Sequence, residues 1–173
     1  MRQETEVLTN LTDSYAREIM KKAGVPEEVR AEAMRTRGDA RPASMSALTW
    51  VIGGGDADAY AAWLCANRRG SRYVDAPALL LDLKGLDAYG ADSMASRFSA
   101  MQHAGLLALA GLDAARWQSL RLELLAEAVT VRARARMPTV IASSRGLDDT
   151  TARLGAQAGR EAASAFCEAV MRA

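Results

Sequence analysis

Three consecutive glycines, Gly53 to Gly55, follow a short apolar run over residues 48–52 and precede an alanine-rich segment. A strand that turns through glycines into a helix can cradle a phosphate, because the backbone N–H groups of the turn point at the anion. Here the glycines are followed by Asp56 and Asp58, and no lysine occurs between residues 23 and 83. Each unscreened carboxylate beside a triphosphate repels it by about 1 kcal/mol or more. The stretch is therefore either a plain glycine turn with an aspartate helix cap or the remnant of a phosphate loop.

Other residues that could carry chemistry are few. Cys65 and Cys167 lie far apart, with no second thiol or histidine at ligand spacing, so the sequence predicts neither a metal site nor a disulfide framework. Both are interpreted as small buried hydrophobes. His103 is the only histidine and has no serine or cysteine partner that would indicate nucleophilic catalysis. We expect no cofactor and no metal.

The overall charge gives no signature of nucleic-acid binding. The 22 Lys and Arg residues nearly balance the 21 Asp and Glu residues, for a net charge of +1. A DNA contact would therefore have to come from a local patch. Arg132, Arg134 and Arg136 form an alternating run, which we interpret as a solvated helix face rather than a DNA-binding stripe. No apolar run is long enough to span a membrane and the first residues are polar, so we expect a cytoplasmic protein without membrane contact.

The elements that would position these residues alternate between helices and short apolar strands. Residues 5–36 predict helix with a break at "AGVPEEVR", where Gly24 suits a helix C-cap and Pro26 suits the start of the next helix. Short apolar runs at residues 48–52, 106–112 and 138–143 are separated by helical stretches. This alternation is typical of a parallel α/β sheet.

Three further segments complete the prediction. Residues 72–85 are ambiguous, but they suit a strand that ends at Tyr73 and Val74, with Asp75 capping a helix from Pro77. The stretch from residue 113 to residue 136 predicts one long amphipathic helix whose apolar face carries five residues: Trp117, Leu120, Leu124, Leu125 and Val129. After "SSRG", Asp148 or Asp149 would cap a final helix that runs close to the end of the chain.

In this order, the segments from about residue 23 to residue 165 resemble the ATPase domain of the DnaC-type helicase loaders and the transposition helper ATPases. These families belong to the AAA+ division of P-loop proteins. The stretch "RMPTVIASSRGLDD" carries the closest resemblance, and it places Ser144 or Arg145 near the family's γ-phosphate-sensing asparagine. The resemblance implies a P-loop (AAA+/RecA-like) α/β fold, a parallel sheet flanked by helices. It also implies a helical N-terminal extension over residues 1–22, followed by a degenerate AAA+-like domain over residues 23–173.

The chain departs from the family at the polar positions of the nucleotide site. The loop lacks the family's Lys and Ser/Thr, and the two magnesium-binding acids of the family fall on Ala110 and Gly111. Asp113 lies two or three residues late and is predicted to point elsewhere. The family's Gly-x-Arg, which contributes an arginine finger, is replaced by "GAQ" at residues 155–157, with Arg160 as a displaced substitute. The resemblance therefore implies a pseudo-ATPase, not an enzyme, with vestigial nucleotide-binding positions at Gly53, Gly54, Gly55 and Ser144.

Two hypotheses for function follow. The first is a non-catalytic protein that acts through protein contacts in DNA replication or mobile-element biology, with an active ATPase relative, a helicase or a second copy as its partner. Its candidate intersubunit contacts are Asp56, Asp58, Arg145 and Arg160. The second is an α/β protein that binds a nucleotide or another small molecule through the Gly53–Asp58 loop.

Overall fold

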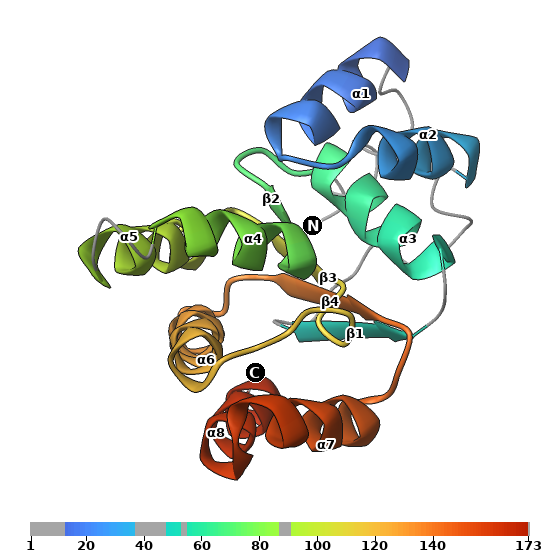
Figure 1. The fold of residues 1–173 in the computed structure, drawn as a ribbon. Helices are drawn as coiled ribbons and strands as arrows, with labels where there is room; N and C mark the ends of the chain where they lie inside the picture. The colour runs from blue at the N-terminus through green and yellow to red at the C-terminus, as the bar shows by residue number, and fades with distance from the viewer. Residues whose placement is uncertain (1–12, 37–47, 53–54, 87–90, 173) are drawn as a thin grey trace.

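Four parallel strands form one sheet, in the spatial order β1-β4-β3-β2 (Figure 1). The computed structural model describes residues 13–36, 48–52, 55–86 and 91–172. The strands are β1 (Leu48–Ile52), β2 (Arg72–Asp75), β3 (Leu107–Ala110) and β4 (Thr139–Ser143). Each neighbouring pair is parallel, with Leu107 opposite Thr139 and Arg72 opposite Leu107. The predicted parallel α/β sheet is confirmed, and the ambiguous segment at residues 72–75 is its edge strand.

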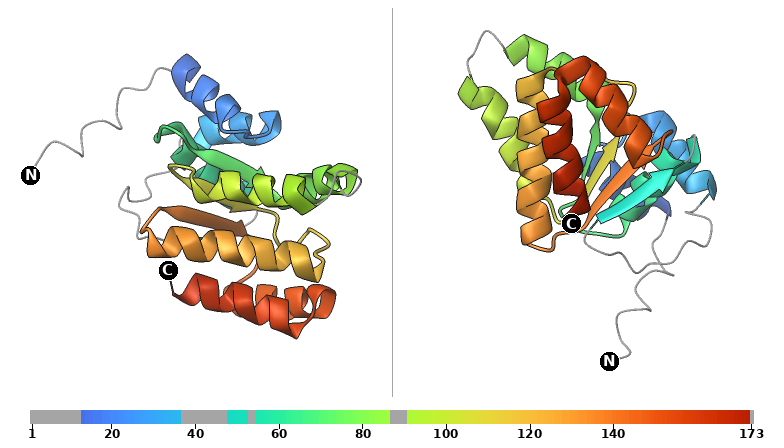
Figure 2. Two further views of the ribbon diagram at one scale, coloured as in Figure 1. Left: turned by 90° about the vertical axis from the view of Figure 1, so that its left-hand side faces the viewer. Right: turned by 90° about the horizontal axis from the view of Figure 1, so that it is seen from below.

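Helices cover both faces of this sheet (Figures 1 and 2). Strand side chains alternate between the faces, so Leu107 and Leu109 belong to one buried cluster, while Ala108 and Ala110 belong to the other. The leucine face packs against α4 (Ala76–Leu86), α5 (Ala91–Gln102), α6 (Ser119–Arg134), α7 (Leu147–Ala158) and α8 (Arg160–Met171). The alanine face packs against α1 (Asp13–Lys22), α2 (Glu27–Thr36) and α3 (Gly55–Ala66). Small residues on this second face let α3 approach the sheet closely.

The linker between α1 and α2 closes the outer edge of β2. Gly24 adopts a φ of 87° just after α1, and its N–H donates to the Lys21 carbonyl, so the predicted helix cap is confirmed. The Tyr73 N–H of β2 donates to the Ala23 carbonyl at 2.7 Å. Met20 of α1 is fully buried in the cluster that contains α3. Residues 5–12 of the predicted helix lie outside the described residues, and the domain boundary at residue 22 stays a prediction.

The predicted long helix is shorter than expected at its start. Helix α6 begins at Ser119, because the chain after β3 first turns back on itself, with the N–H groups of Ala114 and Ala115 donating to the Gly111 carbonyl. Trp117 is buried as predicted, and its indole N–H donates to the Leu112 carbonyl at 2.9 Å. The placement of Leu120 in the apolar face was wrong, since this side chain is 55% exposed.

The predicted final helix is in fact two helices, α7 and α8. Gly159 separates them with a φ of 93°, a backbone conformation that side-chain-bearing residues rarely adopt. The cap prediction for Asp148 or Asp149 was also wrong, because Gly146 is the N-cap and both aspartates lie in the first turn of α7. There they still favour the helix by facing its positive end.

Arg132 on α6 was predicted to be solvated and is instead fully buried. Its Nε donates to Thr139 Oγ1 at 2.9 Å, and its Nη1 donates to the carbonyls of Met101 at 3.0 Å and Ala104 at 2.6 Å. Nη2 donates to the Pro138 carbonyl at 2.5 Å. Burial lowers the pKa of Arg132 to about 10, so the guanidinium remains charged at neutral pH. The neighbouring Arg134 and Arg136 are exposed, as predicted.

Within the described ranges, no helix combines the length and the apolar character that crossing a bilayer requires.

Candidate functional site at the carboxyl edge of the sheet

Several of the residues singled out from the sequence lie at the edge where all four strands end. In parallel α/β sheets, ligands bind in the crevice outside the carboxyl ends of the strands. Strand β2 ends at Asp75, and β3 ends at Ala110 just before Gly111 and Asp113. Ser144 and Arg145 directly follow β4. Helix α3, which begins at Gly55, follows β1 at the same edge.

The predicted phosphate loop is only partly visible. Gly53 and Gly54 lie outside the described residues. Gly55 and Asp56 form the start of α3, and only their backbone is described. Asp58, one turn further along α3, has a half-buried side chain. The loop itself therefore stays a prediction, and the described part of the site begins with this carboxylate.

Asp58 is part of a group of three carboxylates, which we call the acidic edge: Asp58, Asp75 and Asp113. Burial raises the pKa of Asp58, and the negative charges of Asp75 and Asp113 raise it further. These two residues come from the ends of β2 and β3, so the fold concentrates negative charge where a P-loop protein would bind phosphates. The acidic edge disfavours a triphosphate on electrostatic grounds.

Asp75 was predicted as a helix cap, and its contact confirms this. Its Oδ2 accepts a hydrogen bond from the Ala78 N–H at 3.1 Å, in the first turn of α4. Asp75 also lies with the other two carboxylates of the acidic edge, a proximity that the cap prediction did not include. The signal was present, because a residue that directly follows a strand of a parallel sheet lies at the same edge as the ends of the other strands.

The prediction that Asp113 points away from the site was wrong. The Ser144 hydroxyl donates a hydrogen bond to Asp113 Oδ2, and Arg145 Nε lies 3.7 Å from the same oxygen. The chain after β3 turns sharply instead of continuing as a strand, so the alternation of strand side chains does not apply at this position. Ser144, the candidate phosphate sensor, is therefore already bonded to a carboxylate of its own chain.

The end of β3 has no room for an acidic side chain at residue 111. Gly111 has a φ of 68°, and a Cβ built there would lie 2.9 Å from Pro77 Cδ and 3.3 Å from Asp75 Oδ1. The preceding Ala110 is buried and packs in the cluster with α3. The two positions that match the family's magnesium-binding acids thus hold an enclosed methyl group and a glycine whose backbone disfavours any side chain.

The candidate arginine-finger positions lie on the last two helices. Gln157 of α7, where the resemblance would place an arginine, accepts a hydrogen bond through Oε1 from the Trp117 N–H at 3.1 Å. Arg160 is the first residue of α8 and is exposed. Arg145 already has Asp113 as an ion-pair partner within the chain. The roles of Arg145 and Arg160 between subunits stay predictions.

The residues considered for other chemistry do not assemble into a second site. Cys65 is fully buried, and burial raises the pKa of its thiol to about 12, which makes it a poor nucleophile at neutral pH. Across residues 13–36, 48–52, 55–86 and 91–172, no three His, Cys, Asp or Glu side chains are grouped so that they could hold a metal ion.

Solved structures with a similar fold were found. No family model and no curated protein matches this chain. The chain is similar to the crystal structure of DnaI, with 16% identity, 94% of this chain and 90% of that chain covered, and a TM-score of 0.58. It also matches the DnaC helicase loader, with 18% identity, coverage of 91% and 96%, and a TM-score of 0.45. A protein described as a primosome component of Streptococcus pyogenes serotype M3 matches with 19% identity, coverage of 98% and 93%, and a TM-score of 0.47.

The similarity to DnaI extends over nearly the whole chain, so the predicted P-loop α/β fold is confirmed. At this level of identity the comparison establishes the fold and leaves the activity to be argued from the site itself.

Proposed function

We propose that this protein is a non-catalytic pseudo-ATPase that acts through protein contacts in DNA replication or mobile-element biology. The resemblance of its sequence to the helicase-loader ATPases and its fold, shared with DnaI, support the biological setting. The chemistry of the carboxyl edge supports the loss of catalysis.

The main support for the loss of catalysis comes from the end of β3. Metal-assisted phosphoryl transfer needs a carboxylate to hold Mg²⁺ beside the phosphates, and Gly111 offers neither a side chain nor the space for one. Asp113, the next carboxylate along the chain after β3, is bonded to Ser144 and paired with Arg145. No lysine between residues 23 and 83 is present to offset the charge of the acidic edge. In the part of the edge that the structure describes, Asp113 and Ser144 make contacts within the chain, and the carboxylates disfavour a bound nucleotide.

The partner follows from the same resemblance. Members of the resembled family pack side by side and share a nucleotide between subunits, so a subunit without a nucleotide site is suited to contact an active relative, a helicase or a second copy. Asp58 on the carboxyl edge and the exposed Arg160 on α8 are the residues that we assign to such a contact.

An ATPase assay on the purified protein tests the proposal. We expect no Mg²⁺-dependent release of phosphate above background and no change in melting temperature with ATP or ADP. A bound nucleotide at 100 times its Kd would stabilise the fold by about 2.7 kcal/mol, which corresponds to about 5 to 10 °C for a chain of this size. Turnover that survives further purification and disappears in Gly54→Trp would overturn the proposal.

The same melting experiment distinguishes the pseudo-ATPase from the alternative hypothesis, a small-molecule-binding protein. A small-molecule binder that uses the Gly53–Asp58 loop would melt at a higher temperature with its ligand, for which NAD is the first probe. Capture of partners from the native host, with Asp58→Arg as the matched variant, then identifies the protein contact. A partner retained equally by both forms would not use the acidic edge.

A further inference from the structure

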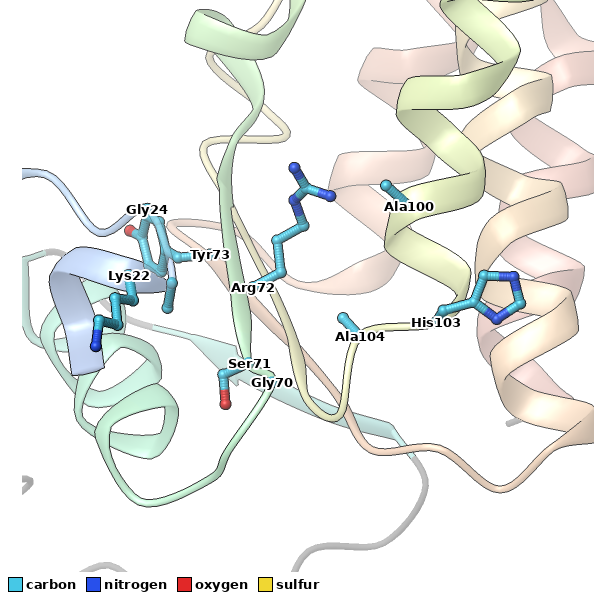
Figure 3. Close-up of a pocket in the computed structure, with 10 residues that line it drawn as sticks. Lys22, Gly24, Gly70, Ser71, Arg72, Tyr73, Ala100, His103 and Ala104 are labelled. Carbon is cyan, nitrogen blue, oxygen red and sulfur yellow. The ribbon is translucent and has the colours of Figure 1, made fainter.

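The start of β2 lies between two adjoining hollows of about 420 and 250 Å³. Lys22 and Ser71 line both of them. Arg72 and His103 belong to the larger hollow, and Arg69 belongs to the smaller one. Figure 3 shows Lys22 and His103 on either side of the start of β2, with Ser71 between them. We call the two hollows together the basic hollow.

We propose that the basic hollow binds an acidic, extended segment of a partner protein, which pairs with the edge of the sheet at Ser71. The inference deepens the proposed function and rests on it, since it names the chemistry of one protein partner. It concerns a second surface, because neither Asp58 nor Arg160 lines the basic hollow.

The backbone at the start of β2 leaves one residue open on the outer edge of the sheet. The Gly70 carbonyl accepts a hydrogen bond from the Gly105 N–H at 2.8 Å, and the Arg72 N–H donates to the Leu106 carbonyl, also at 2.8 Å. Both of these groups face β3. Successive residues of an extended chain direct their backbone groups to opposite sides, so the N–H and C=O of Ser71 face outward. Neither group has a backbone partner among the residues that the structure describes. An unpaired strand edge is a template for a further strand.

The linker after α1 closes this edge again at Tyr73. The Tyr73 N–H donates to the Ala23 carbonyl at 2.7 Å, and Ala23 lines both hollows. An incoming segment would therefore pair with the sheet at Ser71 and end its pairing against Ala23. One paired residue supplies little affinity, since a net hydrogen bond contributes only about 0.5 to 1.5 kcal/mol. Side-chain contacts must supply the rest.

Three cations around Ser71 favour an acidic segment. Arg69 and Arg72 have no hydrogen-bond or ion-pair partner for their side chains among the described residues. Lys22 is 3.6 Å from Glu18, but both side chains are more than half exposed, so solvent weakens this pair. No carboxylate lines either part of the basic hollow. Carboxylates of a partner would give these cations charge-assisted hydrogen bonds.

Acidic residues further along β2 limit where the segment can lie. A third hollow of about 240 Å³ shares Gly24 and Arg72 with the larger part of the basic hollow, and Asp75 and Asp82 line it. These two carboxylates repel other carboxylates. The acidic stretch of the partner is therefore expected at the start of β2 and not beside Asp75.

The apolar wall of the smaller part favours a peptide over other polyanions. Tyr15, which is 44% exposed, and the half-buried Ile19 line it together with Arg69. A peptide that alternates acidic and aliphatic residues presents carboxylates on one side and apolar groups on the other. A polyanion without amide groups would leave the Ser71 backbone unpaired.

Fluorescence anisotropy on the full chain tests the inference. The probe is a labelled peptide of about ten residues in which glutamate alternates with valine, roughly 33 Å long when extended. We expect it to bind at least about tenfold more tightly than the same peptide with glutamine in place of glutamate. Binding should weaken between about 50 and 200 mM salt, because screening shortens the reach of the charges. A peptide with the same glutamates and N-methylated backbone amides should bind at least about fivefold more weakly, because it cannot pair with the Ser71 backbone.

Variants of the chain locate the binding surface. Arg69→Gln/Arg72→Gln should bind the glutamate peptide about tenfold more weakly, because two charge-assisted hydrogen bonds are lost. Arg116→Gln/Arg153→Gln is the matched control, since both arginines are exposed, do not line the basic hollow and remove the same charge. The control should bind within about twofold of the parent, because a distant surface charge changes steering more than affinity. Circular dichroism confirms that each variant is folded.

Any of three results would overturn the inference: equal binding of the glutamate and glutamine peptides, equal losses in the two double variants, or undiminished binding of the N-methylated peptide. Displacement of the peptide by oligo(dT) at an equal concentration of charge would also overturn it, because the hollow would then take polyanions in general. A failure of the pseudo-ATPase proposal would appear in the release of phosphate from ATP and would leave these peptide measurements unchanged.

Discussion

The surroundings of the Asp58 side chain disfavour its charged form. Burial and the charges of Asp75 and Asp113 raise its pKa, so the folded state binds a proton at Asp58 more tightly than the unfolded state does. Stability therefore falls as pH rises from the unfolded pKa through the folded pKa, and the cost remains above this window. Below the unfolded pKa, Asp58 is protonated in both states, so its carboxylate no longer lowers the free energy of unfolding.

Asp58→Asn should therefore stabilise the protein at neutral pH. We expect the melting temperature to rise by about 1 to 3 °C, because the amide keeps the shape of the side chain and removes the charge. The gain should vanish near pH 4, the ordinary pKa of an aspartate. Asp82→Asn, at an exposed position of α4, is the control and should change melting little at either pH. A variant that melts lower than the parent at neutral pH would show that the Asp58 carboxylate is stabilising.

The structural roles of single residues were predicted correctly where they depend on neighbours in the sequence. Gly24 and Asp75 were recognised as caps, because a cap depends on the residue and on its neighbours within one helical turn. Asp113 was misplaced because its partners, Ser144 and Arg145, follow a different strand. The spacing within "LAGLD" carries no information about a contact 31 residues away in the sequence.

Arg132 joins three elements at the amino-terminal edge of the sheet. From α6 it donates to the last carbonyls of α5 and, through Thr139 and Pro138, to the start of β4. The carbonyls of Met101 and Pro138 also accept from the N–H groups of Ala104 and Leu107, so removing Arg132 takes one of their two bonds. The Ala104 carbonyl and the Thr139 hydroxyl lose the Arg132 donor as well, and each buried group left unsatisfied costs about 1 to 3 kcal/mol. The sequence could not show this role, because an arginine in an alternating run on a helix is usually solvated.

Arg132→Met should thus destabilise the protein by about 3 kcal/mol or more. The methionine preserves much of the apolar stem but supplies none of the hydrogen bonds. Arg134→Met is a matched control two residues along the same helix, and its exposed position predicts a change within about 0.5 kcal/mol. Urea unfolding followed by circular dichroism measures both. Equal stability of the two variants would mean that the Arg132 network contributes nothing.

The strands were the most predictable elements. Residues 48–52, 107–110 and 139–143 are short apolar runs between helical patterns, and all three are strands. Helix ends were less predictable. The start of α6 and the break between α7 and α8 depend on backbone turns at Gly111 and Gly159, and neither glycine interrupts the apolar periodicity strongly enough to be read from the sequence.

Leu107→Asp and Val140→Asp test the sheet as the common core. Both side chains are fully buried, on opposite faces of adjacent central strands. A buried, unpaired carboxylate costs several kcal/mol, against a total stability of about 5 to 15 kcal/mol. We expect both variants to lose the soluble folded state, as measured by expression and circular dichroism. Leu120→Asp is the control, because this leucine is exposed and the variant should fold normally.

The charges of the whole molecule are segregated even though they nearly cancel. Asp58, Asp75 and Asp113 lie at the carboxyl edge of the sheet, whereas Lys22 and Arg72 line one hollow at the start of β2, at the other end. This arrangement follows from a parallel sheet, in which every strand starts at one edge and ends at the other. The net charge of +1 hides the segregation, because the contributing residues come from separate segments.

This segregation bears on how copies of the chain would associate. A neighbour that docks at the carboxyl edge meets carboxylates instead of a nucleotide, so its association should not respond to ATP. Arg160 on α8 is exposed and is the candidate partner for Asp58 of another copy. Exposed ion pairs contribute only about 0 to 1 kcal/mol each, so apolar contacts must supply most of the affinity. We expect either a stable oligomer or a monomer that awaits a partner, unchanged by nucleotide in both cases.

Light scattering with and without Mg²⁺-ATP, at low and high salt, decides this prediction. The measured mass should be the same with and without ATP. If an oligomer forms, high salt and Arg160→Gln should both weaken it, while Arg153→Gln, at an exposed position of α7, should not. If the oligomer stays intact at high salt, its interface is apolar and does not depend on the Asp58–Arg160 ion pair. An oligomer that appears only after ATP is added would show that the carboxyl edge still binds nucleotide, because only a bound ligand can shift the equilibrium toward the assembled state.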